Sequence, residues 1–212
     1  MHTVTYSCTF TNNWSGANHP VNYPSNAHWS PPVIAAHSRR YTMWEPNTLA
    51  MEGVKLVAET GGTSTLLSEI ETAQEKRVAG DMVKGDVTFN REIQSQIFSD
   101  ITLTPVFDRM SSITMIAPSP DWFTGFYNIN PVDKSSKFWL KSFEVETYPW
   151  DAGTKKGNTF SGDNSAENPH VPISQFTKDT VPNTGVLSNS ERTEVLPMAT
   201  WSFTLTSNCA AL

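Results

Sequence analysis

The sequence predicts an all-β domain, an antiparallel β-sandwich of about eight strands with two short helices and long ordered loops. Apolar and polar residues alternate in several runs along the chain, which is the period of a half-buried strand. Prolines and glycines, 14 and 11 of them, interrupt these runs, as is typical of strands joined by turns. The 212 residues, 38% of them hydrophobic, suit a single domain over residues 1–212 with a core of its own.

The first and last strands have the clearest pattern. In residues 3–11 and in residues 200–207, apolar residues alternate with polar ones, which would place all the apolar side chains of a strand on one face. The apolar residues are Val4, Tyr6, Cys8 and Phe10 in the first run, and Trp201, Phe203 and Leu205 in the last. Further strands are expected at residues 97–104, 109–116 and 137–147. Because the first and last strands of a sandwich are commonly neighbours, we expect the two ends of the chain to lie together.

Two short helices are expected between the early strands. Residues 47–60 carry apolar side chains at helical spacing and end at two glycines, and a second apolar stripe covers residues 66–73. Residues 12–37 and 153–195 are rich in proline, glycine and polar residues and are expected to form long loops, with room for one short strand in the second. Residues 79–86 are expected to form a turn-rich connection.

The charge distribution and the absent motifs argue against several functional classes. The formal net charge is -6 and the charged residues are scattered, so nucleic acid and anionic membranes are not expected as partners. No apolar run approaches the roughly 20 residues that a membrane-spanning helix requires. The sequence contains no Gly-x-Ser-x-Gly, His-Glu-x-x-His, Cys-x-x-Cys or Walker-type motif, and we therefore expect a protein that is not an enzyme.

The two cysteines, Cys8 and Cys209, lie one near each end of the chain. A Cys8–Cys209 disulfide would join the first and last strands, and a disulfide indicates a secreted protein. The alternative is a pair of buried free thiols in a cytosolic protein. Asn13-Trp14-Ser15 has the form of an N-glycosylation sequence, so Asn13 is a candidate glycan site, which agrees with secretion.

Two acidic residues, Asp121 and Asp151, follow strand-like runs in the same way. Asp151 comes after residues 137–147 and a proline, and Asp121 comes after residues 113–116 and two prolines. Because proline cannot continue a hydrogen-bonded ladder, each acid is expected in a loop at a strand end. If the two strands lie side by side with their ends level, the carboxylates form a hard-oxygen site of the kind that binds calcium.

Longer motifs resemble those of a known family. They are, in order, Tyr6-Ser7-Cys8-Thr9-Phe10-Thr11 with Trp14-Ser15, His19-Pro20, Tyr23-Pro24, Ala27-His28-Trp29-Ser30-Pro31, Ala36-His37-Ser38, Tyr41-Thr42-Met43-Trp44, Gly53, Val57-Ala58-Glu59, Glu69-Ile70-Glu71, Pro118-Ser119-Pro120-Asp121-Trp122-Phe123 with Gly125, and Tyr148-Pro149-Trp150-Asp151-Ala152-Gly153-Thr154. In this order, over residues 4–206, the chain resembles the spondin domain, the N-terminal domain of F-spondin and mindin.

The resemblance implies an extracellular, C-two-like antiparallel sandwich with a calcium ion bound at one end of its sheets. It also implies a secreted, non-enzymatic protein that acts in the extracellular matrix, in cell adhesion and in cell-surface recognition.

The calcium ligands of the family are the Asp of Pro-Ser-Pro-Asp-Trp and two aspartates four apart in Asp-Ala-Gly-Thr-Asp. Asp121 and Asp151 match two of these three ligands, and Lys155 stands at the position of the third. A unit charge about 5 Å from a divalent ion is worth several kcal/mol at an effective dielectric constant of about 20. Three outcomes are open: calcium is retained and Lys155 points to solvent, calcium binding is lost, or the Lys155 ammonium takes the ion's place and pairs with Asp121 and Asp151.

The first functional hypothesis is a secreted spondin-type binding or adhesion domain whose partner is a cell-surface or matrix protein. The alternative is an extracellular carrier of a small apolar ligand, since the loops are rich in aromatic residues. Trp122, Phe123 and Trp150 are the candidate contacts for such a ligand, and ordinary core packing is the competing interpretation of these residues. Recognition of a glycan is a third hypothesis.

Overall fold

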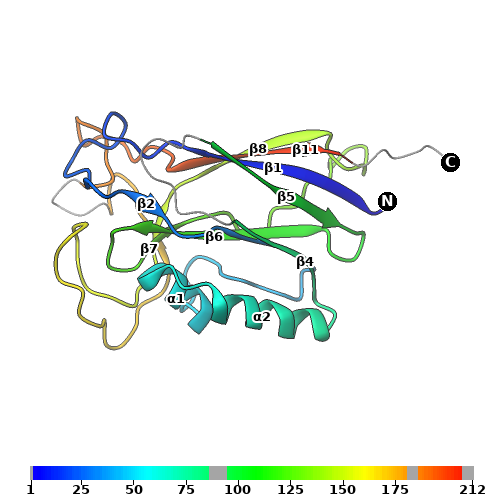
Figure 1. The fold of residues 1–212 in the computed structure, drawn as a ribbon, viewed down its shortest axis with the longest axis horizontal. Helices are drawn as coiled ribbons and strands as arrows, with labels where there is room; N and C mark the ends of the chain where they lie inside the picture. Colours follow the sequence, from blue (N-terminus) through cyan, green and yellow to red (C-terminus); the bar gives the residue numbers. More distant parts are fainter. Residues whose placement is uncertain (1, 86–94, 181–185, 207–212) are drawn as a thin grey trace.

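The computed structural model describes residues 2–85, 95–180 and 186–206. In these ranges the strands form two antiparallel sheets that pack face to face, and two helices cover the outer face of one sheet (Figure 1). This arrangement confirms the predicted all-β antiparallel sandwich with two short helices.

The first sheet has four strands in the order β5-β1-β11-β8. They are β1 (Val4–Asn12), β5 (Ser95–Leu103), β8 (Ser142–Thr147) and β11 (Ala199–Leu205). In the antiparallel pair of β1 and β11, Cys8 lies opposite Phe203 and Phe10 lies opposite Trp201. The strands nearest the two ends of the chain are therefore neighbours, as expected.

The second sheet runs β10-β9-β7-β6-β3-β4, with β2 paired to β6. Its strands are β2 (His28–Trp29), β3 (Val33–His37), β4 (Ala79–Lys84), β6 (Arg109–Ala117), β7 (Trp122–Thr124), β9 (Pro149–Asp151) and β10 (Ser174–Gln175). The described residues thus contain eleven strands rather than about eight. Four of them, β2, β7, β9 and β10, have only two or three residues, which is too short to show an alternating pattern in the sequence.

Aromatic side chains fill the space between the two sheets. The Trp201 ring is fully buried, with its centroid 4.9 Å from that of Phe10 and 5.6 Å from that of Phe126, and both pairs are edge-to-face. This geometry is the one that aromatic quadrupoles favour.

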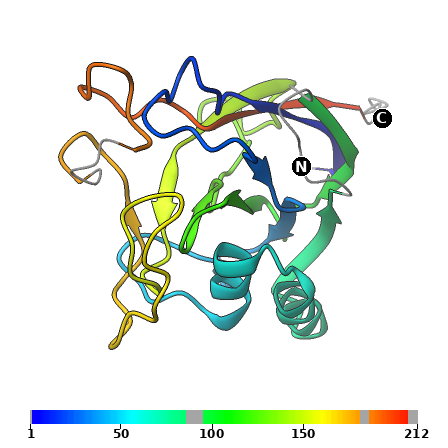
Figure 2. The ribbon, with the colours of Figure 1, turned by 60° about the vertical axis from the view of Figure 1, so that its left-hand side comes forward.

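The helices α1 (Glu52–Thr60) and α2 (Ser64–Glu75) lie side by side on the second sheet (Figure 2). Their buried side chains, including Val57 and Leu66, share one apolar cluster with Ile113 and Phe123 of the sheet. The second sheet is therefore covered on both faces, by the first sheet and by the helices. Within the described ranges, neither helix is long and apolar enough to span a membrane.

This double covering explains why the alternating pattern does not identify β3. All five residues of β3 are buried, so they show no alternation, and the prediction of a loop over residues 12–37 is wrong for this run. The expectation of a turn-rich connection over residues 79–86 was also wrong, because β4 occupies this stretch; its Gly80 and Asp81, which are typical of turns, lie within the strand.

Two expected elements also begin later than predicted. α1 starts at Glu52 rather than at residue 47, and Asn47 has a left-handed φ of 63°. β8 starts at Ser142 rather than at residue 137, and Lys137 also has a φ of 63°. In both cases a residue in the left-handed region interrupts regular structure before the element begins.

The residues that indicated secretion are only partly described. Cys8 is fully buried in β1, where burial raises the pKa of its thiol, and Cys209 lies outside the described residues. The Asn13 amide donates a hydrogen bond of 2.8 Å to the Thr200 hydroxyl. The disulfide and the glycosylation of Asn13 both stay predictions.

Gly125 follows β7 and lies against β6. A β-carbon at this position would collide with the carbonyl oxygen of Ser112 and lie 2.8 Å from its carbonyl carbon. The Ser112 carbonyl also accepts a hydrogen bond of 2.9 Å from the Trp44 indole, and the Ser112 N–H donates to the Phe126 carbonyl oxygen at 2.7 Å, so Ser112 is fixed in place.

We expect Gly125→Ala to lower the free energy of unfolding by about 2 kcal/mol or more, because the two strands must separate to admit the methyl group. Chemical denaturation measures this loss. Gly62→Ala is the matched control, since its β-carbon would meet only the Thr60 hydroxyl, at 3.0 Å, and should change stability by less than about 1 kcal/mol. Equal stability of the two variants would contradict the expected collision.

Candidate metal centre

The two aspartates singled out in the sequence lie next to each other. β7 and β9 are antiparallel partners, with Trp122 opposite Asp151, and Asp121 is the residue before β7. The Ala152 N–H donates to the Asp121 carbonyl oxygen at 3.1 Å. One detail of the prediction was wrong: Asp151 is the last residue of strand β9 rather than part of a loop. Pro149 opens this strand, and its carbonyl still accepts a hydrogen bond from the Phe176 N–H.

The Asp121 carboxylate is fully buried, and its two oxygens differ sharply. Oδ2 accepts three hydrogen bonds: 2.7 Å from the Thr154 N–H, 3.2 Å from the Thr154 hydroxyl and 2.9 Å from the Lys155 N–H. Oδ1 has no hydrogen-bond partner among the described residues. An unpartnered buried carboxylate oxygen is costly, and a bound cation is one way to satisfy it.

Asp151 is held in a tight turn by its own carboxylate. Its Oδ1 accepts a hydrogen bond of 2.7 Å from the Gly153 N–H. Gly153 has a φ of 72°, and a β-carbon there would collide with the Val171 carbonyl oxygen, so the turn requires glycine. The Thr154 and Lys155 N–H groups that follow this turn are the donors to Asp121.

The two carboxylates repel each other in a site with little water. Burial and the charge of Asp121 raise the pKa of Asp151 to about 7, although the Gly153 hydrogen bond opposes this shift. Burial also raises the pKa of Asp121, against its hydrogen bonds to Thr154 and Lys155. The pair is therefore most stable when a positive charge or a proton lies with it.

Lys155, which replaces the third expected ligand, points to a residue that the sequence analysis did not single out as part of the site. Its Nζ lies 3.6 Å from Oε2 of Glu59 in α1, and the two side chains are 24% and 11% exposed. Within the described parts of the chain, Lys155 makes no other ion pair with an N–O distance of 4.0 Å or less. The ammonium thus neither projects freely into solvent nor pairs with the two aspartates.

The donor set fits a hard cation, with fewer protein ligands than the family pattern has. Asp121 Oδ1 is free to accept a ligand bond, and the Asp151 carboxylate is near enough for the charge of Asp121 to raise its pKa, after the larger effect of burial. In the described ranges no group of three or more His, Cys, Asp or Glu side chains is placed to hold a metal. An ion here would take two carboxylates from the protein and its other oxygens from water or backbone carbonyls.

The aromatic candidates for ligand binding lie mostly in the core. Trp122 and Phe123 are fully buried, and Trp150 is 8% exposed. The Trp122 ring packs against Phe176 at 5.2 Å between centroids, and the Trp150 ring packs against Trp44 at the same distance. Their positions fit the core-packing interpretation.

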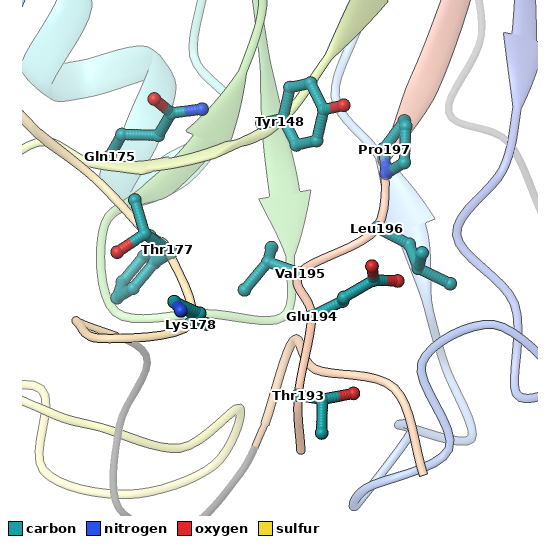
Figure 3. A pocket seen from close by; sticks show the side chains of 10 residues that line it. Tyr148, Gln175, Thr177, Lys178, Thr193, Glu194, Val195, Leu196 and Pro197 are labelled. Carbon is teal, nitrogen blue, oxygen red and sulfur yellow. The ribbon is translucent and has the colours of Figure 1, made fainter. Parts of the chain in front are cut away.

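Two cavities adjoin the side chain of Tyr148, and no sequence motif pointed to them. One, of about 350 Å³, lies between residues 175–178 and 193–197 and is shown in Figure 3. The other, of about 330 Å³, lies along β8 and includes Tyr127 and Trp150. Neither Asp121 nor Asp151 lines either cavity.

We expect stability in the presence of a chelator to fall as the pH rises from about 4 to about 7. The Asp151 pKa rises from 3.8 to about 7 on folding, so in this window the folded state keeps a proton that the unfolded chain has released. The stabilisation is present below pH 4 and is lost as Asp151 ionises. Urea denaturation at pH 5 and pH 8 measures it. Asp151→Asn should flatten this dependence, and an unchanged slope would contradict the assignment.

Comparison with known proteins confirms the resemblance. The family model Spondin_N matches residues 4–187. Spondin-2 of Rattus norvegicus is 34% identical over 175 residues, 81% of this chain and 52% of the relative, and Spondin-2 of Homo sapiens is 33% identical over the same shares. Spondin-1 of Rattus norvegicus is 32% identical over 180 residues, 82% of this chain and 22% of the relative. The chain therefore spans about half the length of Spondin-2 and about a fifth of Spondin-1, and it belongs to the spondin N-terminal domain family.

Proposed function

We propose that the chain is a secreted, non-enzymatic binding domain that acts outside the cell, and that Asp121 and Asp151 hold a calcium ion in it. Family membership supports the first part. The observation that supports the calcium site is the fully buried Asp121 carboxylate, whose Oδ1 has no hydrogen-bond partner, in the neighbourhood of Asp151. Calcium prefers oxygen ligands and tolerates several water ligands, which matches a site with two protein carboxylates.

The residues around the site hold the two carboxylates in place. The N–H groups of Thr154 and Lys155 hold Asp121 through Oδ2, which leaves Oδ1 available. The turn at Gly153 fixes the Asp151 carboxylate. When bound, calcium would supply two positive charges between two carboxylates that otherwise repel each other. Because Asp121 directly precedes β7 and Asp151 ends its partner strand β9, the site would also stiffen the connection between β7, β9 and the loop that follows.

The proposed partner is a protein of the cell surface or the matrix. The cavity in Figure 3 offers a mixed contact surface for it, since polar residues such as Gln175, Lys178 and Glu194 line it together with apolar ones such as Val195 and Leu196. With Trp122 and Phe123 buried in the core, the carrier hypothesis has weaker support than the binding domain.

We expect excess calcium to raise the unfolding midpoint of the natural protein relative to excess chelator. A ligand at a hundredfold excess over its Kd stabilises the folded state by about 2.7 kcal/mol, which is roughly 5–10 °C for a domain of this size. Asp121→Asn should lose the shift, whereas Asp179→Asn, which removes an exposed carboxylate, should keep it. Equal midpoints for the natural protein in calcium and chelator would contradict the calcium site.

We also expect the labelled domain to bind matrix laid down by cultured cells, and to bind it less in chelator or as Asp121→Asn. The reason is that the calcium site would order the loops at this end of the sandwich. Fluorescence retained after washing measures the binding, with the Asp179→Asn variant and heat-denatured domain as controls. Absence of binding to matrix and to intact cells would contradict the binding function without bearing on the calcium site.

A further inference from the structure

Glu59 occupies an unfavourable position for a carboxylate. It is in the last turn of α1, which has no basic residue, and the negative end of the helix dipole disfavours an acid there. Glu59 is nevertheless largely buried, at 11% exposure, and its carboxylate pairs with Lys155 at 3.6 Å. Helix stability alone would favour a lysine or arginine, so the position indicates a role in the neighbouring site.

The main chain of Lys155 keeps its side chain beside Asp121. Its N–H donates to Asp121 Oδ2 at 2.9 Å, and the residue forms a β-bridge with Ala166. The flexible side chain can turn from this fixed point toward Glu59 or toward the unpartnered Oδ1 of Asp121. The charge of Glu59 also raises the pKa of Asp121, which places its carboxylate near the same site.

We propose that Glu59 is a positioning residue that holds the Lys155 ammonium away from Asp121 and Asp151, and so keeps the cation site open. The inference rests on the calcium site proposed above. The side chains of Glu59, Lys155, Asp121 and Asp151 together carry a net charge of two negative units. Because Glu59 and Lys155 neutralise each other, this charge lies on the two aspartates. Without Glu59, the net charge is one negative, and the freed ammonium competes with the ion for Asp121 Oδ1.

The scaffold supports this role because Glu59 is on a rigid element. Val54, Val57 and Ala58 of α1 are buried in the cluster under the helices, and Gly61 ends the helix in a left-handed conformation. The carboxylate is thus delivered to the site from a packed helix rather than from a loop.

The test is a calcium titration by isothermal calorimetry on four proteins: the natural chain, Glu59→Gln, Lys155→Met and the double variant. We expect Glu59→Gln to weaken calcium binding about tenfold or more, because it frees the ammonium. Lys155→Met should bind more tightly than the natural chain. The double variant should bind within about threefold of the natural chain, since it has the same net charge and no ammonium to compete.

The rescue in the double variant separates the proposal from a merely structural role of Glu59, in which both variants that lack Glu59 would be equally weak. That result would overturn the proposal, as would equal affinity of Glu59→Gln and the natural chain, or binding by Lys155→Met alone. If none of the four proteins binds calcium, the calcium site itself fails, which is a distinct result.

A crystal structure of Glu59→Gln in chelator gives a second readout. We expect Lys155 Nζ within 4 Å of an Asp121 or Asp151 oxygen, and an ammonium left in solvent would overturn the proposal.

Discussion

The burial of the Asp121 carboxylate is the constraint on which this end of the domain depends. Three hydrogen bonds from Thr154 and Lys155 converge on its Oδ2, and they can do so only because the chain turns at Gly153. The same turn is closed by Asp151, and the Gly153 and Thr154 carbonyls accept hydrogen bonds from the Val171 and Glu167 N–H groups. The start of a long segment rich in glycine, asparagine and serine is therefore held around a carboxylate, while Phe160, Ile173 and Phe176 of the same segment pack into the apolar clusters.

The covering of the second sheet on both faces explains both its aromatic content and its electrostatics. Neighbouring residues of β7 serve different layers: Trp122 packs into the core between the sheets, and Phe123 into the cluster under the helices. A sheet that is buried on both faces needs two sets of large side chains. The aromatic richness that motivated the carrier hypothesis is accounted for in this way. The same layers keep water from Asp121 and Asp151, and this desolvation is the first cause of their raised pKa values.

Sequence patterns identified the elements whose burial is one-sided. β1 and β11 show clean alternation because only one face of the first sheet is covered. Their pairing could be expected because the first and last strands of a sandwich are commonly neighbours. β3 was missed because both of its faces are buried, and β9 because it is too short. The neighbouring aspartates could be predicted, since a strand, a proline and an acid occur twice. Glu59 could not be assigned to the site, because a glutamate on a helix far away in the sequence carries no signal of its contact with Lys155.

The contact between Glu59 and Lys155 changes how a mismatch in a metal-site motif should be judged. Along the sequence, a lysine in place of an aspartate shifts the charge at the ion by two units, which suggests that the site is lost. In three dimensions the added positive charge is already paired with an acid from another element, and the two matching aspartates come from neighbouring parts of the sheet. What an ion experiences is the sum of all nearby charges, including those of side chains that do not ligate it. A ligand position can therefore change without the site being lost, provided that a neighbouring element supplies the opposite charge and holds the new side chain away.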